Sequence, residues 1–184
     1  MRNAALLAIF AVVAGIYCGG TPEAPKTEAV KEATQLPAEA YQPLDSAQIA
    51  QMVAAAPGVA EALKAANYSP MPTEGEAITS FLPKMVDGMK AVAGVEDALK
   101  KVNVTWDEFR ATFLKVTAAS AAMGVDATAS MAAEMAKDTA AAAQKAMKEF
   151  EALKATLSTV PQANKDIVKK FEKDLSQLPL FGGR

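Results

Sequence analysis

The stretch "GVEDALKKVNVTWDEF", residues 94–109, decides the fold because it ends a helix and begins another twice within a few positions. Its leading glycine tolerates the left-handed conformation that closes a helix, and Asn103 is the next best residue for that conformation. Thr105 and Glu108 have the spacing of a capping box, in which two side chains bond the free N–H groups at a helix start. The stretch therefore predicts a short helix, residues 95–102, between two longer ones.

A shorter copy, "GVAEALKAANYS", occupies residues 58–69, at an offset of 36 residues. The match aligns Gly58 with Gly94 and Asn67 with Asn103. Repeats of about this length are typical of duplicated helix pairs. Because every matched residue has a role in ending or starting a helix, we interpret the motif as a duplicated corner and not as a catalytic signature.

The chain from Asp45 onward has helical periodicity and lacks the period-2 alternation of strands. Ser46 is expected to cap the first helix, and Pro57 to open the second. The expected helices cover residues 46–56, 57–66, 73–92, 95–102, 106–123, 127–157 and 161–178. The sequence thus predicts an all-α bundle of packed helical hairpins with an internal 36-residue helix-turn-helix duplication and one long Ala-rich helix, residues 127–157.

Two other helix starts are predicted from local spacing. Thr73 and Glu76 form a capping-box pattern ahead of an apolar stripe that runs from Ile78 to Val92. Thr159 is predicted to cap the last helix, which opens with a proline. Pro83 lies inside the apolar stripe, and we expect it to bend or split that helix.

The first 20 residues, "MRNAALLAIFAVVAGIYCGG", have the build of a secretory leader, with Arg2 ahead of an apolar run. That run, residues 4–17, is shorter than the roughly 20 residues that a membrane-spanning helix needs. The position of Cys18 resembles that in bacterial lipoprotein leaders, and this resemblance, which covers the leader alone, implies a lipid anchor on Cys18. Such leaders usually have a small residue before the cysteine, where this chain has Tyr17, so ordinary cleavage after Gly20 is the alternative. Either route predicts export to the bacterial periplasm or outer membrane.

Residues 21–44 are predicted to be a disordered tether, because four prolines interrupt a polar stretch that has no apolar stripe to bury. The folded domain is then expected to comprise residues 45–184. Cys18 is the single cysteine of the chain, so the domain carries no disulfide. An exported domain of this kind must draw its stability from its core.

Composition argues against several classes of function. The net charge of −2 gives no attraction to nucleic acid. The chain has no histidine and no zinc, calcium or phosphate-loop motif, so we expect no cofactor, no metal site and no enzyme activity. Thioethers bind Cu(I), but the pairs Met85–Met89 and Met131–Met135 lie on stripes where methionine more often fills a core.

We therefore expect an interaction, scaffold or chaperone-like module of the cell envelope, working through a protein partner or through self-association. The alternative is a carrier that holds an apolar or lipid-like ligand inside the helical bundle. An internal cavity would favour the carrier, whereas an exposed apolar patch would favour a binding partner.

Overall fold

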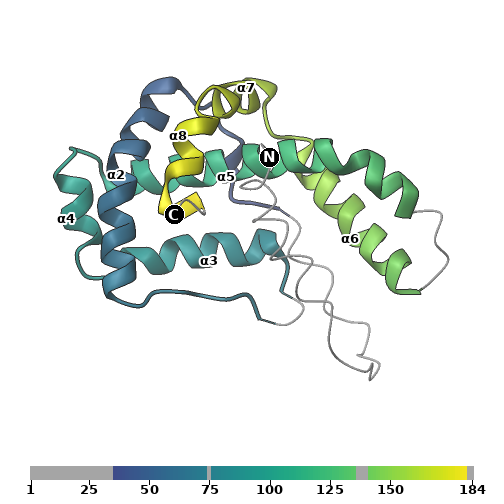
Figure 1. Cartoon of the computed structure of the whole chain (residues 1–184), viewed down its shortest axis with the longest axis horizontal. Helices are drawn as coiled ribbons and strands as arrows, with labels where there is room; N and C mark the ends of the chain where they lie inside the picture. The colour runs from purple at the N-terminus through teal and green to yellow at the C-terminus, as the bar shows by residue number, and fades with distance from the viewer. Residues whose placement is uncertain (1–34, 74–75, 136–140, 182–184) are drawn as a thin grey trace.

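The computed structural model of the 184-residue chain describes residues 35–73, 76–135 and 141–181 (Figure 1). Over these ranges the chain is helical, without a strand, and the helices pack against one another, which confirms an all-α bundle. The elements are η1 (Ala38–Tyr41), α2 (Ser46–Ala65), α3 (Ile78–Lys90), α4 (Val95–Lys100), α5 (Trp106–Met135), α6 (Ala141–Leu157), α7 (Gln162–Lys170), α8 (Glu172–Gln177) and η2 (Pro179–Phe181).

Helix α5 runs through the centre of the bundle and lies against α2, α3, α4, α6, α7 and η1 (Figure 1). Its side chains Phe109, Leu114 and Val116 are each at most 1% exposed. The ring of Phe113 stacks on that of Phe181 with a centroid distance of 5.2 Å, so the C-terminal turn η2 closes over the same core.

Helix α2 is continuous where the sequence predicted two helices. Pro57 lies inside it and cannot donate the N–H that an interior residue normally supplies. Met52, Ala56 and Val59, on both sides of the proline, are each at most 1% exposed and belong to one core. Burial of both halves in one core keeps the helix in one piece, since tertiary packing supplies most of a helix's stability.

The cap of α2 is Asp45, and not Ser46 as the sequence predicted. The Asp45 carboxylate accepts the Gln48 N–H at 2.8 Å, and the Gln48 side chain accepts the Asp45 N–H at 3.2 Å. This reciprocal pair is a complete capping box, displaced by one residue from the predicted position.

Helices α5 and α6 form a hairpin in place of the predicted long helix over residues 127–157 (Figure 1). The helix that begins at Trp106 does not stop near Met123 but continues to Met135. Val125 is 2% exposed, so the buried face of the helix extends past Gly124. The Thr128 hydroxyl also donates to the Gly124 carbonyl at 3.0 Å, as it does inside a helix.

The capping pattern at Thr73 makes a turn ahead of α3 rather than its first turn. The Thr73 N–H and hydroxyl both donate to the Glu76 carboxylate at 3.1 Å. The helix begins later, at Ile78, where Ala77 is the N-cap and offers no side-chain bond. Pro83 lies inside α3 without splitting it, because buried residues flank the proline on both sides.

The C-terminal helix also differs from its prediction. Thr159 does not cap it, since its hydroxyl donates back to the Thr156 carbonyl at 2.9 Å. Pro161 is the N-cap instead, with no side-chain bond. The helix is divided at Phe171 into α7 and α8.

The segment of residues 36–44, which we name the strap, belongs to the domain and corrects the predicted boundary at residue 45. Leu36, Ala40 and Leu44 are 7%, 0% and 4% exposed. They recur at every fourth position, and η1 between them packs on α5. This proline-bearing segment, which the sequence assigned to a disordered tether, is therefore part of the packed core. Residues 21–34 of that tether lie outside the described residues.

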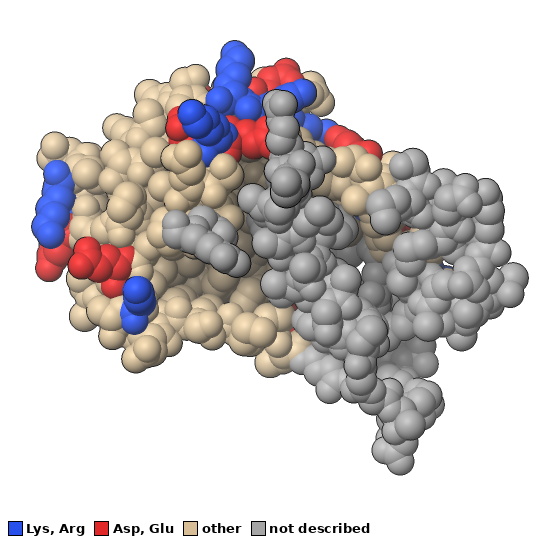
Figure 2. All heavy atoms as spheres, viewed as in Figure 1, with Lys and Arg blue, Asp and Glu red and all other residues tan. Residues whose placement is uncertain are grey.

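Charged side chains are unevenly distributed over the face shown in Figure 2. They gather at the top, over α7 and α8, and at the left edge near α4. The surface between these groups is largely uncharged.

Candidate functional site

The two repeat copies close their helices with the same hydrogen bonds. Asn67 and Asn103 have left-handed φ angles of 51° and 55°, the conformation expected of them. The next residue in each copy then donates its N–H back across the turn, from Tyr68 to the Leu63 carbonyl at 2.9 Å and from Val104 to the Leu99 carbonyl at 3.1 Å. Each bond joins an N–H to the carbonyl five residues earlier, which is the hydrogen bond of a Schellman motif at a helix C-terminus. The sequence repeat is therefore also a repeat of backbone geometry.

Thr105 and Glu108 form the capping box at the start of α5. The Glu108 carboxylate accepts the Thr105 N–H at 2.8 Å, and the Thr105 hydroxyl accepts the Glu108 N–H at 3.3 Å. The Thr105 N–H, followed by the Thr105 hydroxyl, holds the pKa of Glu108 below its usual value. Both polar side chains are thereby committed to the helix start, which is the structural role that the sequence assigned to them.

The two copies also pack against each other through a reciprocal contact between small residues. A Cβ built on Gly58 would lie 3.0 Å from the Cβ of Ala98, and one built on Gly94 would lie 3.4 Å from the Cβ of Ala62. Gly58 thus faces Ala98, which lies four residues after Gly94, and Gly94 faces Ala62, which lies four residues after Gly58. These contacts pack α4 against the second half of α2 and place Gly94, with φ of 91°, at the N-cap of α4.

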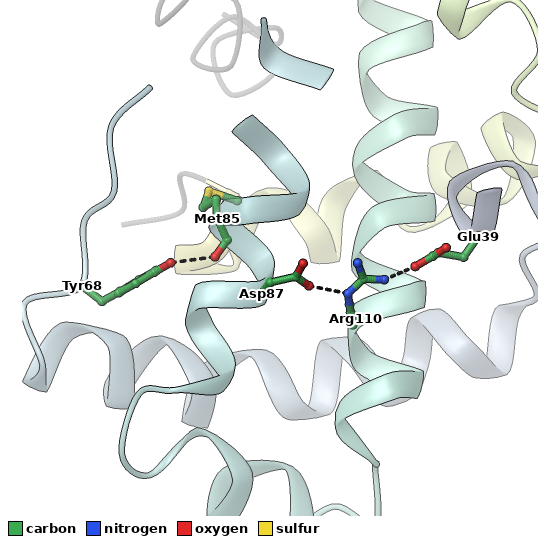
Figure 3. Close-up of polar contacts among 5 residues, drawn as sticks. All are labelled: Glu39, Tyr68, Met85, Asp87 and Arg110. Carbon is green, nitrogen blue, oxygen red and sulfur yellow. Dashed lines mark hydrogen bonds and ion pairs between the residues drawn. The ribbon is translucent and has the colours of Figure 1, made fainter. Parts of the chain in front are cut away.

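After the corner the copies diverge, because the first is followed by an extended segment. The Tyr68 hydroxyl donates to the Met85 carbonyl at 2.7 Å and so pins this segment to α3 (Figure 3). Gly88 leaves the space that the phenol occupies, since a side chain there would meet the Tyr68 hydroxyl. Burial raises the pKa of Tyr68.

Arg110 joins three elements of the fold. Its Nε donates to the Asp87 carboxylate of α3 at 2.5 Å, and its Nη1 pairs with the Glu39 carboxylate of the strap (Figure 3). The Arg110 side chain is 22% exposed, so the pairs are partly shielded from water. No sequence motif marks Arg110, and the structure gives it a role in holding the strap.

Two buried side chains grip the main chain of the strap. Asn164, on α7 and 0% exposed, accepts the Leu44 N–H and donates to the Gln42 carbonyl, both at 2.9 Å. Lys115, on α5 and 6% exposed, donates to the Pro43 carbonyl at 2.9 Å. Sequence reasoning missed both functions, and the one available signal was a polar residue on an otherwise apolar face.

The described residues contain no group of three acidic, cysteine or histidine side chains that could hold a metal ion. Glu96 and Asp97 lie at the start of α4, exposed and beside Lys100, so they form a solvated charge cluster. Met89 is buried in the core and Met85 is half-buried against it. The side chains of Met131 and Met135, the other predicted thioether pair, lie outside the described residues.

A shallow depression of about 260 Å³ lies between α5 and α7. Its lining includes Met123 and the ion pair of Lys165 with Asp126, whose charged atoms are 2.9 Å apart. Pockets for apolar ligands are lined mainly by apolar side chains. The charged lining of this depression is therefore more like an ordinary helix–helix groove than a ligand pocket.

Comparison of the chain with protein-family models, curated proteins and solved structures gives no match. Among the helices of the described ranges, none has the combined length and apolarity needed to cross a membrane. Cys18 and the predicted leader lie outside those ranges.

Proposed function

We propose that this chain is an exported, non-catalytic protein of the bacterial cell envelope, whose helical domain acts as an interaction, scaffold or chaperone-like module. The leader pattern of residues 1–20 supports export, and Cys18 supplies the attachment point for a lipid. The polar groups that bond within the domain also support a structural reading. The Thr105–Glu108 box closes a helix end, and Arg110 joins the strap and α3 to α5.

The observation that carries the proposal is an uncharged, alanine-rich face on α2. Between Ser46 and Ala60 the helix contains no charged residue. Its exposed side carries Ala47, Ala50 and Ala54 at helical spacing, together with the uncharged Gln51. This part of α2 belongs to the largely uncharged surface of Figure 2.

Such a face suits a partner helix for two physical reasons. Alanine side chains let two backbones approach closely, because the spacing between packed helices depends on the side chains at the contact. Because the face carries no charge, a partner can cover it without desolvating a charged side chain. Desolvation is the main cost of burying a charged surface.

The test is to place a charge on this face in the full chain, with its own leader, and to cross-link proteins in intact cells. Ala54→Arg is expected to remove the cross-linked complexes of the wild-type chain. Ala163→Arg, at an exposed alanine of α7, is the matched control and should retain them. Both variants must keep the wild-type urea midpoint. Identical complexes in all three chains would contradict the proposed face.

The anchor has a separate test. Metabolic labelling with palmitate should mark the wild-type chain and leave Cys18→Ser unlabelled. A mature protein that begins at Thr21 would rule out the lipid while leaving export and the α2 face intact.

A further inference from the structure

We propose that the cleft that holds the strap is a peptide-binding site, and that it also takes the strap of a second copy of this chain. Two copies would then associate by exchanging residues 36–44. The cleft is formed by α5 and α7, which supply Arg110, Lys115 and Asn164. The proposal concerns a surface other than the α2 face and is independent of it.

The strap has the internal order of a preformed ligand. The Ala40 N–H donates to the Pro37 carbonyl at 2.9 Å, and the Gln42 N–H donates to the Glu39 carbonyl at 3.1 Å. The Leu36 N–H donates to the Tyr41 hydroxyl at 3.2 Å. These bonds lie within the strap, so it can leave the cleft as a unit. A ligand ordered before it binds loses less conformational entropy on binding.

The cleft recognises the main chain of the strap as peptide-binding sites do. Asn164 bonds both an N–H and a C=O of the bound segment, and Lys115 bonds the carbonyl between them. These three bonds would form with many sequences. Arg110 adds selectivity because its guanidinium pairs with the carboxylate of Glu39.

The buried side chains of the strap complete the description of the ligand. Leu36, Ala40 and Leu44 occupy its first, fifth and ninth positions, and Glu39 its fourth. The site therefore takes a peptide with aliphatic residues at those three positions and a carboxylate just before the middle one. A second copy of the chain carries this sequence without alteration.

The junction between the strap and α2 allows the exchange. The capping box of Asp45 and Gln48 closes α2 with residues that follow the strap, so α2 stays capped when the strap moves. Leu44 is followed directly by Asp45, the N-cap of α2, so the hinge is short, and short hinges favour exchange between copies. Because the contacts in an exchanged pair repeat those within one chain, exchange has little cost beyond association itself. Attachment to its own chain gives the strap a high effective concentration, so exchange in the wild type requires a high local concentration of copies.

Two charge-reversal variants test the exchange, because each breaks the pair of Arg110 with Glu39 within its own chain and the pair can re-form only between the two variants. Glu39→Arg places two arginines together within one chain, and Arg110→Glu places two glutamates together. When the two full-length variants exchange straps, the introduced arginine of one chain meets the introduced glutamate of the other, and the native Glu39 and Arg110 meet in the second cleft. Native mass spectrometry is expected to show a one-to-one heterodimer in the mixture and monomers of each variant alone. Folded variants that remain monomeric when mixed would overturn the proposal.

Single cysteines provide a second measurement that leaves most of the contact intact. In a Cys18→Ser background, Glu39→Cys in one chain is mixed with Arg110→Cys in another and treated with a bismaleimide cross-linker, because the long Glu39 and Arg110 side chains leave their backbones too far apart to assume a direct disulfide. A chain that carries both cysteines shows how readily the cross-link forms within one molecule. Ala163→Cys replaces Arg110→Cys as the control for random collision. Cross-linking between Glu39→Cys and Arg110→Cys should exceed the control several-fold, and equal yields would refute the exchange.

Discussion

Replacing Gly58 by alanine should destabilise the domain through one contact that a second substitution removes. The new Cβ would lie 3.0 Å from the Cβ of Ala98, whereas packed carbon atoms prefer about 3.5–4.0 Å. Overpacking of this kind costs about 1–3 kcal/mol. Alanine returns about 1 kcal/mol through its higher helix propensity. The single variant is therefore expected to lose about 0–2 kcal/mol of its free energy of unfolding.

A double-mutant cycle separates the contact from helix propensity. Ala98→Gly alone loses about 1 kcal/mol of propensity, and in the double variant this loss offsets the gain at Gly58. The coupling energy between the two sites should then stabilise the double variant by about 1–3 kcal/mol relative to the sum of the singles. Urea unfolding monitored by circular dichroism measures all four free energies, provided that the slope m is unchanged.

The second copy supplies the control for this cycle. A Cβ at Gly94 would lie 3.4 Å from Ala62, an ordinary contact, but the backbone there has φ of 91°. Gly94→Ala should cost about 1–2 kcal/mol through backbone strain, and Ala62→Gly should not recover it. A coupling energy near zero at Gly58 and Ala98, or one of equal size in both copies, would refute the reciprocal contact as described.

Three other outcomes are expected. Asn164→Ala leaves the Leu44 N–H without its buried partner and should cost about 1–3 kcal/mol of unfolding free energy. Faster amide hydrogen exchange across residues 36–44 should accompany it, and unchanged exchange would show that the asparagine does not hold the strap. Thr105→Ala should cost about 1 kcal/mol through the lost cap, and loss of an interaction at unchanged stability would contradict its structural role. NMR titration should place the pKa of Glu108 below the ordinary value of about 4.3. The pKa of Glu108 is lower in the folded state than in the unfolded state. The ionised Glu108 therefore stabilises the fold fully when the pH is above the unfolded-state pKa, and this stabilisation is lost as the pH falls through the folded-state pKa. A Glu108 that titrates at or above the ordinary value would contradict this reading.

Local rules were sufficient where a few neighbouring residues decide the backbone. Asn67, Asn103 and the Thr105–Glu108 box behave as their spacing predicts, because their bonds join residues at most five positions apart. The same rules failed at Thr73 and Thr159. In both places another residue became the N-cap of the helix, so the threonine lay too far ahead of the first turn to reach its N–H groups.

Tertiary contacts decided the features that the sequence did not reveal. Pro57 stays inside a helix because both halves of α2 are buried against one core. Glu39 and Arg110 are 71 residues apart in sequence, and Asn164 bonds Leu44 across 120 residues. No periodicity or motif connects positions so distant, and a single sequence offers no other signal. The strap was consequently assigned to the tether although its apolar residues recur at every fourth position.

The reciprocal packing of the two copies encloses the small residues at their contact, because Gly58 faces Ala98 and Gly94 faces Ala62. The pairing is nevertheless unequal, because α4 has 6 residues and α2 has 20. The first half of α2 has no counterpart in the second copy, and its alanines stay exposed. That inequality leaves one uncharged helix face available to a partner, which is the face that the proposed interaction requires.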